Sequence, residues 1–99
     1  MGHLWINAGL EVPPEIDLQE AKDALAELVA ITLQEPECFQ FEAYQSKQNP
    51  RHFALRECFA SEAALQAHYD APYTQAYFAK GYTRIRYVEK FDAQVLGHE

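Results

Sequence analysis

The chain has 99 residues, of which 48% are hydrophobic and 23% are charged, and 15 acidic against eight basic residues give a formal net charge of −7. This length fits one domain, and the acidic balance argues against a nucleic-acid binder or a partner of anionic membranes, because both need a basic surface. No apolar run is long enough to span a membrane, and residues 1–5 lack the basic and apolar segments of a signal peptide, so we expect a cytoplasmic protein.

The N-terminal part predicts a strand followed by a helix. Residues 3–12 alternate between apolar and other side chains, which is typical of a strand with one apolar face, and Pro13 ends that strand. Asp17 occupies the N-cap position of a helix that ends before Pro36, because the residue before a proline leaves the helical region. The inward positions of this helix recur with helical spacing: Ala21, Leu25, Leu28, Val29 and Thr32.

The middle of the chain predicts a β-hairpin. Residues 38–45 and 52–60 both alternate, and a turn-rich stretch joins them. A register that matches their apolar faces places Cys38 opposite Cys58 and Phe41 opposite Leu55. The two cysteines then share the outer face, either as a cross-strand disulfide or as free thiols, and free thiols are expected in a cytoplasmic protein. The inward positions of the hairpin are Phe39, Phe41, Ala43, Phe53, Leu55, Glu57 and Phe59.

The C-terminal part predicts helix again and then a last strand. Ser61 is an N-cap, and the inner face of the helix after it carries Ala64, Leu65 and His68. Pro72 starts a second helical segment that closes at Gly81. Its inner face is Tyr73, Ala76 and Tyr77. Residues 83–91 then predict a strand, so we expect a domain over residues 1–92 and a tail over residues 93–99.

This order predicts an α+β protein with the ferredoxin-like βαββαβ arrangement, an antiparallel sheet with its helices on one face. The other face of the sheet is then bare, and it carries Trp5, Asn7, Gln40, Tyr44 and Arg56. Because a small domain buries a limited share of its surface and this face is rich in aromatic side chains, we expect a homodimer that uses Trp5, Tyr44 and Arg56.

Two polar residues fall on the covered side of the sheet, Glu57 in the third strand and His68 in the helix after it. A histidine beside a carboxylate can act as a base near neutral pH, although the two can also serve only to satisfy each other's hydrogen bonds. The spacing of histidines and cysteines matches no zinc site, and the four glycines form no phosphate-binding loop, so we expect neither a metal nor a nucleotide cofactor.

Several of these segments also resemble one known family. Glu35-Pro36-Glu37-Cys38, Phe53-Ala54-Leu55-Arg56-Glu57-Cys58-Phe59, Ser61 to His68 and Pro72-Tyr73 together resemble the antibiotic-biosynthesis-monooxygenase (ABM) family of dimeric α+β barrel proteins. The resemblance implies a dimeric barrel with a small-molecule pocket between helices and sheet in each subunit. Characterised members of the family include oxygenases of quinols and anthrones that use no metal, flavin or haem, and an isomerase-type branch, while many other members have no known activity.

The resemblance implies roles for particular residues. His68 would be the base and Glu57 would orient it, while the pocket that binds a small-molecule substrate would be lined by Tyr73, Tyr77, Phe41 and Phe59. The chain departs from the family pattern at Leu55 and Phe59, where the anthrone-oxidising branch has an asparagine and a tryptophan, and at Tyr73, where several relatives have a second histidine.

These departures leave three hypotheses open. The first is a cofactor-independent monooxygenase of quinol-like aromatic compounds. The second is a non-redox isomerase or binding protein for small molecules. The third is a dimeric protein without catalytic activity, in which aromatic side chains fill the cleft.

Overall fold

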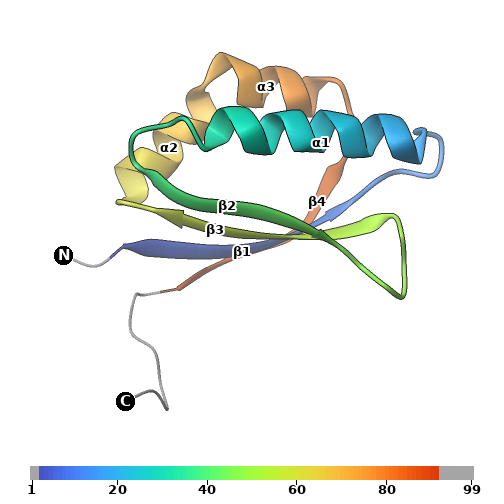
Figure 1. Ribbon diagram of the computed structural model, residues 1–99, viewed down its shortest axis with the longest axis horizontal. Helices are drawn as coiled ribbons and strands as arrows, with labels where there is room; N and C mark the ends of the chain where they lie inside the picture. Colours follow the sequence, from blue (N-terminus) through green and yellow to red (C-terminus); the bar gives the residue numbers. More distant parts are fainter. Residues whose placement is uncertain (1–2, 92–99) are drawn as a thin grey trace, which may run out of the picture.

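A four-stranded antiparallel sheet covered on one face by helices forms the computed structural model, which describes residues 3–91 (Figure 1). The elements in chain order are β1 (Leu4–Glu11), α1 (Leu18–Thr32), β2 (Cys38–Gln45), β3 (His52–Phe59), α2 (Glu62–Asp70), α3 (Pro72–Ala79) and β4 (Arg84–Phe91). The strand order is β2-β3-β1-β4. The predicted ferredoxin-like α+β fold is therefore confirmed, and the tail predicted at residues 93–99 lies outside the described residues.

Local hydrogen bonds explain where the helices begin and end. The Asp17 carboxylate accepts a hydrogen bond of 3.0 Å from the Glu20 amide, and the Ser61 hydroxyl accepts one of 3.1 Å from the Ala64 amide. Pro72 stands in the first turn of α3 and divides the second helical region in two. Gly81 closes this region with a φ of +72°, a backbone angle that L side chains rarely adopt.

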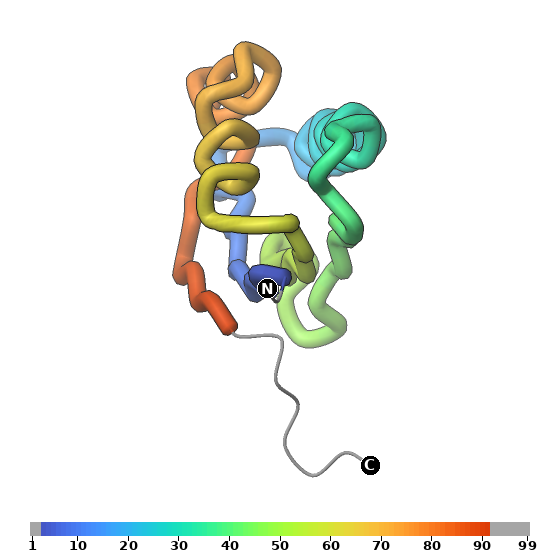
Figure 2. Tube along the Cα trace, turned by 90° about the vertical axis from the view of Figure 1, so that its left-hand side faces the viewer, coloured from blue at the N-terminus to red at the C-terminus, as the bar shows by residue number. Residues whose placement is uncertain are grey.

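The hydrophobic core lies between the helices and one face of the sheet. Figure 2 shows α1 above the β2 side of the sheet and α3 above the β4 side, with the sheet below both. Each layer contributes fully buried side chains, among them Ile6, Leu10, Phe41, Phe59 and Leu65. The predicted inner residues of α1 and α2 are all buried except Val29, which packs against the core, so the apolar periodicity located the core correctly.

The predicted register of the hairpin is wrong by two residues from Gln40 to the turn, and β2 also contains a β-bulge. Gln40 pairs with Cys58, and Phe41 pairs with Glu57 rather than with Leu55. The irregularity between Cys38 and Gln40 adds a residue to β2 and reverses the alternation there. Phe39, which was expected inside, is 52% exposed.

The same bulge separates the two cysteines. Cys38 pairs with Phe59 on the covered face of the sheet, whereas Cys58 pairs with Trp5 on the bare face. Both are buried and both are free thiols, as expected. The structural reason is that their side chains lie on opposite faces of the sheet.

The predicted inner face of α3 is also wrong at one position. Ala76 is exposed, and Thr74 is buried together with Tyr77 instead. In a helix of eight residues, Thr74 and Tyr77 lie one turn apart and form the buried stripe.

The bare face of the sheet is aromatic, as expected. The Arg56 guanidinium lies 5.4 Å from the centre of the Trp5 ring, and Tyr44 is 53% exposed. Tyr87 and Phe91 of β4 pair with Gly9 and Trp5 and extend this face. We call the residues Trp5, Tyr44, Arg56, Tyr87 and Phe91 the open sheet face.

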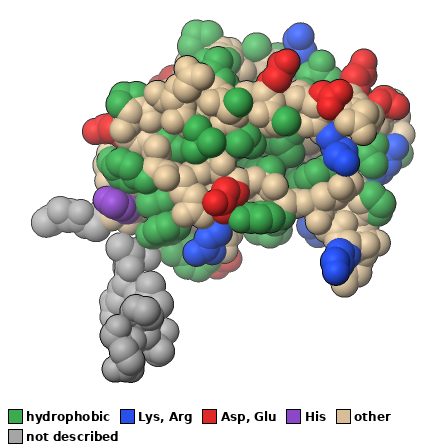
Figure 3. Space-filling view, in the orientation of Figure 1, with side chains coloured by type: hydrophobic (Ala, Val, Ile, Leu, Met, Phe, Trp, Pro, Cys, Tyr) green, Lys and Arg blue, Asp and Glu red, His purple; other side chains and the backbone are tan. Residues whose placement is uncertain are grey.

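The helical layer has a different character. Acidic side chains gather over α1 in the space-filling view (Figure 3), and the exposed ones in this helix include Glu20, Asp23 and Glu27. Among the helices of residues 3–91, none is both long enough and apolar enough to cross a membrane.

Candidate functional site

Three polar side chains from separate segments meet beside the core. Nδ1 of His68 in α2 lies 2.9 Å from Oε2 of Glu35, which belongs to the connection between α1 and β2. The Tyr73 hydroxyl of α3 donates a hydrogen bond to the same carboxylate oxygen. His68 is buried, while the Glu35 side chain keeps 17% of its surface exposed. We call these residues the Glu35–His68–Tyr73 cluster.

The cluster fixes which ring nitrogen of His68 is available. An ionised carboxylate can accept hydrogen bonds but cannot donate them. The contact with Glu35 therefore places the proton of the neutral imidazole on Nδ1 and leaves Nε2 free to accept a hydrogen bond or a proton. Burial and the hydrogen bond to Glu35 raise the pKa of Tyr73 to about 12, so its hydroxyl stays protonated and serves as a donor. The two donors therefore hold one carboxylate against one side of the imidazole.

Aromatic side chains hold the ring of His68 in place. The centres of the Phe41 and Phe59 rings each lie 5.4 Å from the centre of the imidazole, and the Tyr69 ring lies 5.8 Å away. The structure thus places Phe41 and Phe59, two of the predicted pocket residues, in contact with the predicted base.

A small cavity touches both predicted polar residues. It has a volume of about 30 Å³, and Glu57 and His68 both line it. The rest of its wall is mostly apolar and comes from the sheet and from the helices: Ala8, Leu10, Leu28, Phe41, Leu55, Tyr69, Phe78, Ile85 and Val88. We call this space the inner cavity.

Glu57 lies at the inner cavity without a partner. It is buried, and no hydrogen bond to its carboxyl group is formed by any group in residues 3–91. Burial raises its pKa from 4.5 to about 7, because a charged carboxylate loses its water. Near neutral pH the group is therefore divided between its neutral and charged forms and can give up or take a proton.

The expected pairing of Glu57 with His68 is replaced by the pairing of Glu35 with His68. Periodicity assigns residues of strands and helices to faces, and it correctly brings Glu57 and His68 to one space. It cannot say where a connecting segment runs, and Glu35 lies in such a segment. The one signal for Glu35 in the sequence is its place in the Glu35-Pro36 pair that resembles the family motif.

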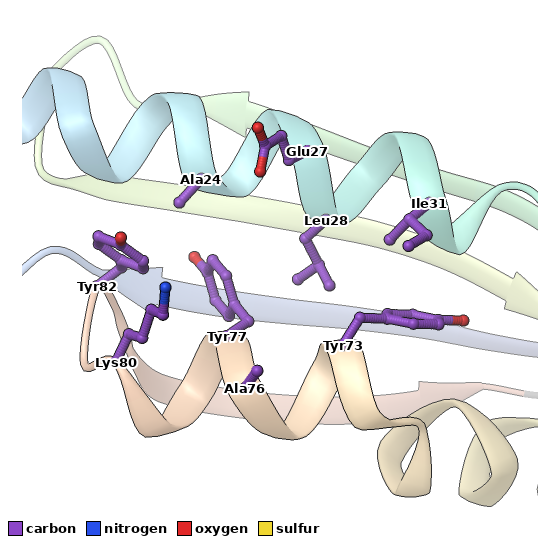
Figure 4. A pocket seen from close by; sticks show the side chains of 9 residues that line it. All are labelled: Ala24, Glu27, Leu28, Ile31, Tyr73, Ala76, Tyr77, Lys80 and Tyr82. Carbon is purple, nitrogen blue, oxygen red and sulfur yellow. The ribbon is translucent and has the colours of Figure 1, made fainter.

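A larger cleft lies between α1 and α3 (Figure 4). It has a volume of about 250 Å³, and side chains of three tyrosines, Tyr73, Tyr77 and Tyr82, line it. The Tyr77 hydroxyl accepts a hydrogen bond of 3.0 Å from Thr83, and burial raises its pKa. Leu28 lines both this cleft and the inner cavity.

A third space borders the cluster from outside. This outer groove has a volume of about 370 Å³ and is lined by Glu35, Pro36, Glu37, Ala64, Ala67 and Tyr73. Glu35 and Tyr73 therefore face the outer groove, while His68 faces the inner cavity.

Cys38 lies near the cluster but is a poor nucleophile. Burial, followed by the negative charge of Glu35, raises the pKa of its thiol to about 11. Within residues 3–91, no three side chains of histidine, cysteine, aspartate or glutamate come together as they would around a metal ion.

Comparison with known proteins adds a family and a set of solved structures. Residues 5–80 match the sequence profile of a family described as antibiotic biosynthesis monooxygenase. Among proteins with curated descriptions, none matches the chain.

Three solved structures illustrate the likeness. A candidate antibiotic biosynthesis monooxygenase of Caulobacter crescentus is 25% identical over 95% of this chain and 92% of its own, with a TM-score of 0.80. One of Bacteroides thetaiotaomicron is 24% identical over 99% of this chain and 95% of its own, with a TM-score of 0.79. A structural-genomics protein named YJCS is 24% identical over 93% of this chain and 99% of its own, with a TM-score of 0.85.

Proposed function

This chain belongs to the antibiotic biosynthesis monooxygenase family, and we propose that it is a monooxygenase of quinol-like aromatic compounds that works without a cofactor and uses His68 as its base. The observation that carries the proposal is the inner cavity, which is bordered by His68 and Glu57 and otherwise mostly by apolar groups. Since Glu35 binds Nδ1, the Nε2 of His68 is the nitrogen that accepts the substrate proton.

The substrate ring binds in the cleft between α1 and α3. The inner cavity, at about 30 Å³, is too small for an aromatic ring, whereas the cleft has about 250 Å³ and three tyrosines that can stack on a ring. Leu28 lines both spaces, and we expect its movement to let a hydroxyl group of the ring reach His68.

The reaction starts when His68 removes a phenolic proton. The electron-rich anion reacts with dioxygen, and one oxygen atom bonds to the ring carbon beside the phenolate. The peroxide takes up a proton from Glu57, and the ring carbon returns its hydrogen to Glu57 as a proton. The O–O bond breaks to release hydroxide, which takes up the proton held by His68 and becomes water. The products are a hydroxyquinone and water, so the quinol supplies all four electrons that dioxygen accepts.

Glu57 supplies the proton that the peroxide needs. Because its pKa is about 7, a large share of the Glu57 carboxyl group is protonated at physiological pH. It therefore has a proton to give to the peroxide. The mostly apolar wall of the inner cavity disfavours water beside His68.

An oxygen electrode tests the proposal with a panel of benzoquinols and naphthoquinols. We expect oxygen consumption above autoxidation, and a fall in kcat of roughly 100-fold or more in His68→Gln. Gln66→Ala, on the exposed side of the same helix, is the matched control and should keep the activity. Consumption equal to autoxidation, or an unchanged rate in His68→Gln, would rule the proposal out.

A second candidate function rests on the same two groups. A base at His68 and a neutral acid at Glu57 on one small cavity also suit a proton transfer between two carbon positions, as in an isomerase. An isomerase would convert its substrate under argon as fast as in air, so repeating the panel without oxygen separates the two functions.

We further propose that two copies pair through the open sheet face. This face is exposed and aromatic, and the Arg56 guanidinium over the Trp5 ring is a flat surface suited to a second copy. Such pairing is what the family resemblance implies for a dimeric α+β barrel.

A further inference from the structure

We infer that Glu35 is the exit for the substrate proton: it receives a proton from Nδ1 of His68 and passes it to water in the outer groove. The inference rests on the proposed role of His68 as a base and adds a route that the base needs. A buried imidazole that gains a proton at every turnover must also lose one, and the inner cavity is lined by mostly apolar groups, which take up no proton.

The geometry connects two spaces through two side chains. His68 lines the inner cavity, and Glu35 lines the outer groove of about 370 Å³. The two are joined by the 2.9 Å contact between Nδ1 and Oε2, and Glu35 keeps 17% of its side chain exposed. A proton taken from the substrate on one side of the imidazole can thus leave from the other side.

The surroundings of Glu35 favour this role over that of a simple tether. The Tyr73 hydroxyl donates to the same carboxylate oxygen and has a pKa of about 12, so it stabilises a charged Glu35 without competing for the proton. No lysine or arginine forms an ion pair with Glu35 within residues 3–91, so its charge is not neutralised by a permanent partner. The other titratable groups near it are Glu37, in the same groove, and Cys38, whose thiol is affected by the charge of Glu35.

The proton balance of the step is simple. Nε2 gains the phenolic proton, Nδ1 gives its own proton to Oε2 of Glu35, and Glu35 gives that proton to water. The imidazole ends neutral with its proton on Nε2. It gives that proton to the hydroxide released when the O–O bond breaks, and Nδ1 regains a proton from water through Glu35. No electron moves in this step.

Two variants test the route. Glu35→Gln keeps a hydrogen-bond acceptor for Nδ1 but cannot take a proton, so we expect kcat to fall roughly 10- to 100-fold while KM changes little. In Glu35→Ala the outer groove has room for a small acid, so added acetate should restore much of the lost kcat. Glu37→Ala, exposed in the same groove, is the matched control and should show neither the loss nor the rescue.

A second measurement needs no substrate, so it separates failure of this inference from failure of the proposed function. In protein labelled with nitrogen-15 at histidine, NMR follows the exchange of the His68 Nδ1 proton with water. We expect slower exchange in Glu35→Gln than in the wild type, and acceleration by acetate in Glu35→Ala. A wild type that oxidises no quinol but shows this exchange pattern would refute the proposed function alone. Folded Glu35 variants that exchange and turn over like the wild type, or that acetate does not rescue, would refute the inference.

Discussion

The carboxyl group of Glu57 links the chemistry of the site to the stability of the fold. A group whose pKa is higher in the folded than in the unfolded chain makes its full contribution to stability below the unfolded value. That contribution is lost as pH rises through the folded value. For Glu57 these values are 4.5 and about 7, so the loss falls in this interval and amounts to about 3 kcal/mol.

Glu57→Gln should therefore remove part of the pH dependence of the free energy of unfolding. We expect the variant to match the wild type in free energy of unfolding at pH 4.5 and to exceed it by about 2–3 kcal/mol at pH 8. Guanidinium unfolding at the two pH values measures the difference, with Glu15→Gln, an exposed site, as control. Equal stability of variant and wild type at pH 8 would show that Glu57 is solvated in the folded protein.

At the scale of single residues, the sequence could predict two members of the site, Glu57 and His68, but not Glu35. Glu57 and His68 were identified because they interrupt an apolar period on two elements whose inner faces must meet. Glu35 was not, because it follows the end of α1, and the path of a connection depends on the packed structure around it. The outward position of Phe39 was missed for a related reason, since a β-bulge belongs to the pairing of two strands and not to either strand alone.

At the scale of elements, one glycine of β1 makes room for an aromatic ring of β4. Gly9 pairs with Tyr87, and a Cβ atom placed on Gly9 would overlap the Tyr87 ring. Since that ring lies across the backbone of β1 on the open sheet face, any larger residue at position 9 must push it away.

Gly9→Ala should consequently destabilise the protein by about 1–3 kcal/mol, the usual cost of an overpacked site. Combining it with Tyr87→Ser should recover most of this loss, because the ring that the new methyl group meets is then absent. Thermal or denaturant unfolding of the two single variants and the double variant measures the coupling. Additive losses would mean that the Tyr87 ring does not cover Gly9 in solution.

The order of elements was the most predictable feature at this scale. Asp17 and Ser61 accept the hydrogen bonds expected of N-caps, and Pro72 divides the helical region where its missing amide predicts. These signals are local, so they can be read from the sequence. The hairpin register was wrong because it also depends on the partner strand.

At the scale of the whole molecule, the two faces of the sheet differ. One is covered by helices and holds the site, and the other exposes Tyr44, Tyr87 and Phe91. Within residues 3–91 the helices cover only one face, so the open sheet face is the surface that we expect a second copy to cover.

Light scattering after size-exclusion chromatography tests this expectation. The wild type should have about twice the chain mass of 11.3 kDa, and Tyr44→Asp should shift it toward the monomer, because a charge would be buried between the two sheets. Leu33→Asp is the matched control, since Leu33 is also an exposed apolar residue but lies at the end of α1 in the helical layer. A monomeric wild type, or equal dissociation by both substitutions, would contradict pairing through this face.

The proposed chemistry is tested most directly by the fate of dioxygen. Turnover of an active quinol under oxygen-18 gas, followed by mass spectrometry of the product, shows whether an atom of dioxygen enters the ring. The proposal predicts one labelled oxygen atom in each hydroxyquinone formed and almost no product with His68→Gln. An unlabelled product, or labelled product formed at the same rate by His68→Gln, would contradict a monooxygenase that uses His68 as its base.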